Sequence, residues 1–131
     1  MGQGEAAVQV RRDIGRRMIR PFLALALLAV PAAGMAQAPL SLEHRMLLRC
    51  SAAFAITANR QASGEADALA YPALAARGRE YFVRASARVM DEAGLDRGAV
   101  AQALETEARD LVANGTLAQV MPVCLALLPP E

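Results

Sequence analysis

Few residue types in this chain could do chemistry, and the candidates are widely spaced. The two cysteines are Cys50 and Cys124. In an oxidising compartment an even pair of cysteines indicates a disulfide, whereas in a reducing cytosol the same pair would be two buried thiols. A redox-active pair usually needs a Cys-x-x-Cys arrangement at a helix start, and this pair is spaced differently. We therefore predict a structural disulfide.

The chain has one histidine, His44, which we consider as a metal ligand. On a helix, a second ligand would stand at the fourth position onward, and Leu48 occupies that place. Glu43 alone does not complete a metal site. We expect no metal or other cofactor and interpret His44 as an exposed surface residue.

A stripe of three arginines and one tyrosine is the most distinctive polar pattern. Guanidinium groups along a helix face, with a phenol between them, could bind a carboxylate or phosphate surface. Acidic residues stand at helical pairing distances from these arginines: Glu80 near the first two, and Asp91 and Glu92 after the last. We prefer a solvated face. The alternative is an anion-binding or partner-binding surface formed by Arg77, Tyr81, Arg84 and Arg88.

Three carboxylates, those of Glu105, Glu107 and Asp110, raise the question of acid–base catalysis. Such catalysis needs carboxylates in a pocket that shifts their protonation. Glu105 and Asp110 are predicted to point away from the core, and Arg109 stands four residues after Glu105. We therefore interpret the three carboxylates as a solvated face. The sequence also shows no recognisable Ser-His-Asp set and no glycine-rich phosphate loop. We predict that the protein is not an enzyme.

The N-terminal segment predicts the compartment. Five arginines precede the apolar run at residues 22–30, and small residues around a proline follow it, which is the pattern of a secretory signal peptide. The run is about half of the roughly 20 residues that a membrane-spanning helix needs. We predict a signal peptide over residues 1–36, with Ala38 as an alternative cleavage point and Met18 as an alternative start.

The mature chain, residues 37–131, has the size of one small domain. It holds nine arginines and eleven acidic residues, a net charge of −2. A nearly neutral domain lacks the basic surface of a nucleic-acid binder, so we exclude nucleic acid as a partner. We expect the domain to be periplasmic or secreted, with membrane contact only through an uncleaved leader.

Apolar residues recur at helical spacing, and no alternating pattern typical of strands is found. We predict an all-α fold: a small four-helix domain, arranged as a pair of helical hairpins and closed by the disulfide. Ser41 and Asp96 suit helix N-caps, and Gly94 suits a helix stop. The predicted helices cover residues 42–60, 72–93 and 97–113, with a helical turn at 66–70 and a last piece from 116 that Pro122 kinks or restarts.

The predicted faces of these helices determine the expected core. The first helix should bury Leu42 along with Cys50 and Phe54, and the second should bury Phe82 while Tyr81 faces outward. Leu95 and Val100 stand at the two positions of a hydrophobic staple around the third N-cap. Asn114–Gly115–Thr116 matches a glycosylation acceptor, but we interpret it as a helix stop.

The functional expectation is an exported helical protein that acts by binding a protein or an envelope component. Alternatives are a chaperone-like protein or an accessory subunit of an envelope enzyme. In general plan, a two-cysteine helical domain of this size is similar to the acid-stress chaperones of enteric bacteria. That resemblance is one of architecture alone, and it implies opening on protonation. The oligomeric state stays open.

Overall fold

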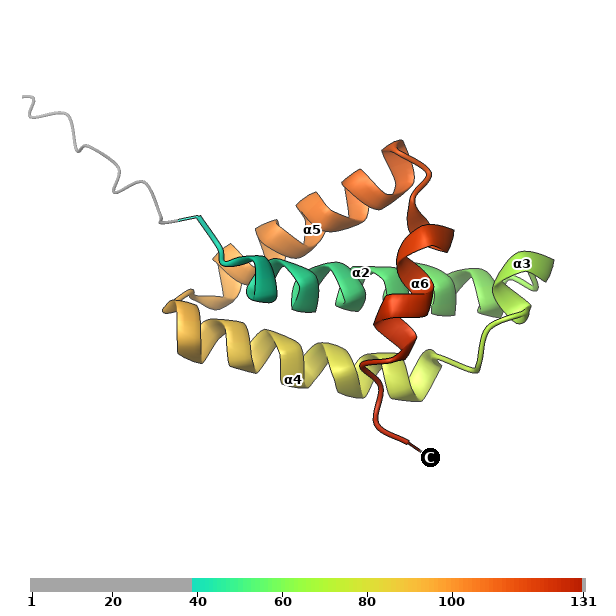
Figure 1. The fold of residues 1–131 in the computed structure, drawn as a ribbon, viewed down its shortest axis with the longest axis horizontal. Helices are drawn as coiled ribbons and strands as arrows, with labels where there is room; N and C mark the ends of the chain where they lie inside the picture. The colour runs from blue at the N-terminus through green and yellow to red at the C-terminus, as the bar shows by residue number, and fades with distance from the viewer. Residues whose placement is uncertain (1–38, 131) are drawn as a thin grey trace, which may run out of the picture. The chain divides into compact units, whose positions relative to one another are not determined.

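The computed structural model describes residues 39–130, so the predicted signal peptide and its cleavage point lie outside the described residues. Within that range the chain is all-helical and has no strand, which confirms the predicted fold class. The one-turn helix expected near residue 66 is present as α3. The elements are α2 (Leu42–Ala62), α3 (Ala66–Leu69), α4 (Ala75–Ala93), α5 (Arg97–Ala113) and α6 (Leu117–Leu125), as Figure 1 shows.

The predicted caps are present. The side chain of Ser41 accepts a hydrogen bond of 3.1 Å from the His44 amide, and that of Asp96 accepts one of 2.8 Å from the Ala99 amide. Gly94 ends α4 with φ 64°, a left-handed conformation that side chains disfavour. The Gly94 stop and the Asp96 cap together fix the short connection between α4 and α5.

α2 is the central helix, because it packs against each of the other four. Phe54 of α2 is fully buried and lies against α4 at Gly78. A Cβ built on Gly78 would stand only 3.0 Å from the Cβ of Phe54, so glycine lets the two helices approach closely here. The main buried cluster comprises Cys50, Ala52, Ala53, Phe54, Leu74, Tyr81, Ala85, Leu111, Met121 and Cys124.

The predicted start of the second long helix is wrong. Pro72 lies in a non-helical segment, and α4 begins three residues later. The side-chain amide of Gln61, near the end of α2, holds this segment. Its Oε1 accepts from the Leu74 amide at 3.1 Å, and its Nε2 lies within hydrogen-bonding distance of three carbonyl oxygens, those of Ala68, Tyr71 and Pro72.

Two predicted core positions face solvent instead. Leu42 is 79% exposed, because the first turn of α2 contacts α4 through Glu43 and His44, on another side of the helix. Phe82 is 38% exposed, because α4 presents the adjacent Tyr81 to α2. Leu48, which stands one helical turn after His44, is fully buried with Val89 and Val100 in a second cluster. Leu95 packs against this cluster with Val100, as a hydrophobic staple requires.

The last helix does not form a hairpin with α5. α6 crosses α2 and packs chiefly on it (Figure 1). The helix also continues through Pro122 without restarting. The arrangement is therefore a three-helix layer of α2, α4 and α5 with α6 laid across it, rather than two stacked hairpins.

Candidate functional site

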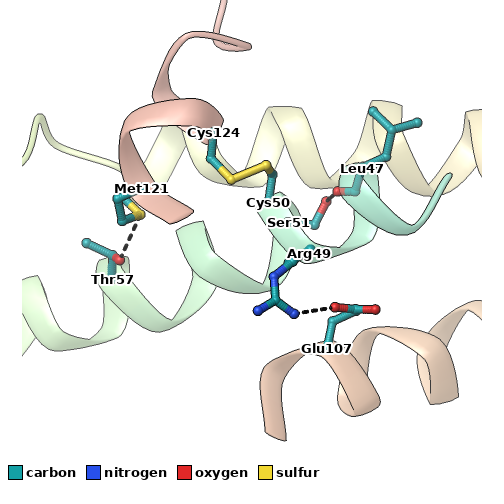
Figure 2. The surroundings of a disulfide bond; sticks show 8 residues. All are labelled: Leu47, Arg49, Cys50, Ser51, Thr57, Glu107, Met121 and Cys124. Atoms are coloured by element: carbon teal, nitrogen blue, oxygen red, sulfur yellow. Dashed lines mark hydrogen bonds and ion pairs between the residues drawn. A yellow bond between two sulfur atoms is a disulfide. The ribbon is translucent and has the colours of Figure 1, made fainter. Parts of the chain in front are cut away.

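The predicted disulfide joins α2 to α6. The Sγ atoms of Cys50 and Cys124 lie 2.06 Å apart, and the two residues are separated by 74 positions in the sequence. Both cysteines are fully buried. Further along the same contact, the Thr57 hydroxyl donates to the sulfur of Met121 at 3.5 Å (Figure 2). A buried bond between α2 and α6 has a structural role and is shielded from other thiols.

A charged cluster lies on the α5 side of α2, next to the disulfide. Arg49 follows Leu48 in the sequence and points to α5, whereas Cys50 points to α6 (Figure 2). One nitrogen of Arg49 lies 2.8 Å from a carboxylate oxygen of Glu107 and 2.6 Å from one of Asp110, and the other donates to the Thr116 hydroxyl at 3.1 Å. The cluster thus fastens α5 and the turn after it to α2.

The interpretation of the three carboxylates as a solvated face is therefore wrong for Glu107. This side chain is only 8% exposed and receives a second hydrogen bond from Arg45 at 3.3 Å. The hydrogen bonds that Arg49 donates, first to Asp110 and then to Glu107, raise its pKa, so its guanidinium stays charged. Every charge in the cluster faces an opposite one, which is the arrangement of a structural ion-pair network.

The prediction holds for Glu105. Its carboxylate lies 3.7 Å from Arg109 one turn later, and both side chains are largely exposed.

The stripe predicted on α4 is not one exposed surface, because Tyr81 is buried, although Tyr81 lines one depression together with Arg84 and Arg88. Its ring meets that of Phe54 edge to face, with 5.1 Å between the ring centres. Gly78 brings α4 so near to α2 that the face through Gly78, Tyr81 and Ala85 becomes the buried one. For Tyr81 to face solvent, the helix would have to be turned by about one residue, roughly 100°.

The three arginines of the stripe have separate neighbours. Arg77 donates to the backbone carbonyl of Pro129 at 2.7 Å. Arg84 lies 3.6 Å from Glu80, as the spacing predicted. Arg88 donates to Glu92 on its own helix at 2.9 Å and to Glu43 at the start of α2 at 2.6 Å. The pairs within α4 were predictable from spacing, but the one to α2 was not.

The prediction that His44 is an exposed surface residue is wrong. Its side chain is 13% exposed, and its Nε2 lies 2.9 Å from a carboxylate oxygen of Glu92. Glu92 thus joins His44 of α2 to Arg88 of α4. The two hydrogen bonds lower the pKa of Glu92, and the one with His44 has the larger effect. In the described part of the chain, no group of three or more His, Cys, Asp or Glu side chains is arranged to hold a metal ion.

An apolar groove lies between α4 and α5, which diverge from their connecting turn (Figure 1). Its volume is about 570 Å³. Phe82, Val83 and Met90 of α4 and Leu104 of α5 supply its apolar lining, and Ser86 also lies there. Neither helix covers the groove, so a partner could enter it.

Comparison with known proteins gives no match to this chain among protein-family models, curated proteins or solved structures. Among residues 39–130, no helix is both long enough and apolar enough to cross a membrane. The buried disulfide fits an exported protein, because such bonds persist in oxidising compartments.

Proposed function

We propose that this protein is exported to the periplasm or secreted after loss of its signal peptide, and that it acts there by binding a protein partner rather than by catalysis. The observation that carries the proposal is the α4–α5 groove. Its apolar residues include Val83, which is 59% exposed, and Phe82, which is 38% exposed. Exposed apolar clusters of this kind on small domains mark interaction sites.

The chemistry of the lining indicates the kind of partner. The ionisable side chains that line the groove are one acid, Asp91, and one base, Arg97, so their charges cancel. An anionic membrane surface would call for clustered basic groups. A neutral apolar lining instead suits the apolar face of a partner helix, with contacts at successive turns.

One polar atom adds a specific contact. The hydroxyl oxygen of Ser86 is buried and has no hydrogen-bond partner among the described residues. Since it lies on the groove, it can pair with one polar atom of the bound segment. A partner would thus present an apolar helix face that carries one donor or acceptor.

The test compares two exposed valines in intact cells. A photo-crosslinking residue is placed at Val83 in the groove or at Val112, which is 68% exposed on α5 but lies outside the groove. We expect a discrete crosslinked partner from position 83 alone, and its loss when Met90→Asp is added. Equal crosslinking from both positions, or a Val83 product that Met90→Asp leaves intact, would refute the proposal.

A second measurement identifies the kind of partner. If the Val83 product is a dimer of this chain, the groove binds another copy, and size-exclusion chromatography should show a dimer that Met90→Asp dissociates. If the product is a heterologous protein, its crosslinked peptide should be helical with an apolar face. A chaperone-like role, the alternative, predicts instead many different products from position 83, because unfolded clients share no sequence.

A further inference from the structure

The hydroxyl of Tyr81 is a buried polar group with nothing to bind. Tyr81 is 6% exposed, and its Oη makes no hydrogen bond to any described residue. Buried phenol groups usually find a hydrogen-bond partner, because leaving one without a partner destabilises the folded state. A buried polar group without a partner calls for an explanation. One explanation is that a bound ligand supplies the missing hydrogen bond.

A cavity of about 290 Å³ has Tyr81 in its lining. It lies between α2, α4 and the segment after α6, with Leu47, Leu127 and Leu128 as apolar walls. Arg84 and Arg88 of α4 line it beside Tyr81. It shares no lining residue with the α4–α5 groove, so it is an independent site. Its volume is at the low end for small-molecule sites, which are mostly apolar with a few fixed polar groups.

The two arginines differ in how freely they can turn to a ligand. Arg88 is fixed by Glu43 and Glu92 on either side of it. Among the described residues, Arg84 has only the exposed pair with Glu80 at 3.6 Å. Such a surface pair contributes little, so exchanging Glu80 for a carboxylate in the cavity costs little.

The phenol is present as a neutral donor. Burial raises the pKa of Tyr81 from its ordinary value of 10.0, and the nearby positive charge of Arg88 opposes that rise only in part. At neutral pH the hydroxyl therefore keeps its proton and can donate it to an acceptor in the cavity.

We propose that this cavity binds a small monocarboxylate with a short apolar body. The carboxylate accepts a hydrogen bond from Tyr81 and pairs with Arg84, while the apolar body lies against Leu47 and Leu128. A phosphate or sulfate would leave the leucine walls without contact, and a neutral alkane would leave the phenol unpaired. A monocarboxylate satisfies both parts of the lining.

The experiment uses hexanoate as probe and hexan-1-ol as its uncharged counterpart. The chain has no tryptophan and two tyrosines, so in the Tyr71→Phe variant all tyrosine fluorescence comes from Tyr81. We expect hexanoate to change this emission saturably and to raise the Tm. Hexan-1-ol should bind about tenfold more weakly or worse, the factor that 1.4 kcal/mol produces.

Two variants test the assigned contacts, each with a control. Arg84→Gln should weaken hexanoate binding by roughly tenfold, the effect of losing one charge-assisted contact. Arg109→Gln is the control and should leave binding unchanged. Arg109 pairs with Glu105 as Arg84 pairs with Glu80, four residues apart and exposed, but it lies on α5 and does not line the cavity. Tyr81→Phe should weaken the hexanoate-induced Tm shift severalfold, yet leave the Tm without hexanoate unchanged or higher.

The last result separates a ligand site from a structural hydroxyl. If Tyr81→Phe lowers the Tm without hexanoate, the hydroxyl already has a partner within the protein and the proposal fails. It also fails if hexan-1-ol binds as tightly as hexanoate, or if Arg84→Gln leaves hexanoate binding unchanged, as Arg109→Gln should. It fails as well if hexanoate changes neither the Tyr81 emission nor the Tm. None of these outcomes bears on the α4–α5 groove.

Discussion

α2 is fastened on two sides by contacts of different kinds. Toward α6 the contact is covalent and apolar, with the Cys50–Cys124 disulfide in its centre. Toward α5 it is ionic, with Arg49 held between Glu107 and Asp110. Because Arg49 and Cys50 are neighbours in the sequence, one turn of one helix supplies both contacts (Figure 2).

The difference follows from the lengths of the helices involved. α6 has nine residues, too few to be stable in isolation, and it contains a proline that removes one helical hydrogen bond. A short helix laid across α2 needs a covalent tie. α5 has seventeen residues and its own caps, so polar contacts suffice to set its position against α2.

The strongest way to break the comparison is to remove the covalent contact. Closing a loop of this length lowers the entropy of the unfolded chain by roughly 4–5 kcal/mol in free energy. Cys50→Ser should therefore lose about that much stability, a large part of the 5–15 kcal/mol typical of a domain. Urea unfolding monitored by circular dichroism measures it. An unchanged unfolding midpoint would show that α6 holds its place without the bond.

The ionic contact is tested by Glu107→Gln. The variant keeps the shape of the side chain but leaves Arg49 with one carboxylate in place of two, at a part-buried site. We expect a loss of about 1–3 kcal/mol of unfolding free energy. Glu105→Gln on the exposed face of the same helix is the control, with a loss below about 0.5 kcal/mol. Equal effects of the two variants would mean that burial adds nothing to the Glu107 contact.

The sequence was sufficient to predict the first of these contacts and insufficient for the second. Cys50 and Cys124 have only each other as partners, so residue counting and compartment predicted their pairing. Arg49 is one of many arginines, and its partners lie 58 and 61 positions away. Nothing in the spacing of a single sequence selects those two acids from the rest.

The same limit explains the errors on α4. Helix caps and the Gly94 stop depend on neighbours within a few residues, and they were predicted correctly. Which side of α4 is buried depends on where Phe54 of α2 meets Gly78, a contact between distant segments. A tyrosine suits either side, since its ring is apolar and its hydroxyl polar. The position of Tyr81, and with it the cavity, therefore emerges only from the packing.

A smaller effect sharpens the description of the α6 contact. Thr57→Val removes the hydroxyl that donates to Met121 while filling the same buried space. Sulfur is a weak acceptor, so we expect the unfolding free energy to change by less than about 1 kcal/mol. Differential scanning calorimetry of the disulfide-bonded variant measures the change. A loss comparable to that of Glu107→Gln would mean that the α6 side also depends on polar contacts.

The smallest predicted effect concerns the exposed contact between α2 and α4 through Glu92. Its pKa in the folded protein is lowered from 4.5, first by the hydrogen bond with His44 and then by that with Arg88. Since the folded state favours the ionised form, Glu92 stabilises the fold above that ordinary value, and the contribution is lost as the pH falls through the lowered pKa. Urea unfolding from pH 7 to pH 3 should therefore show a shallower acid decline for Glu92→Gln than for the unchanged chain. In a His44→Ala background the same substitution should matter less, because the principal hydrogen bond is already gone. Parallel curves for the variant and the parent would show that this exposed contact, unlike the part-buried one at Arg49, contributes nothing measurable to folding.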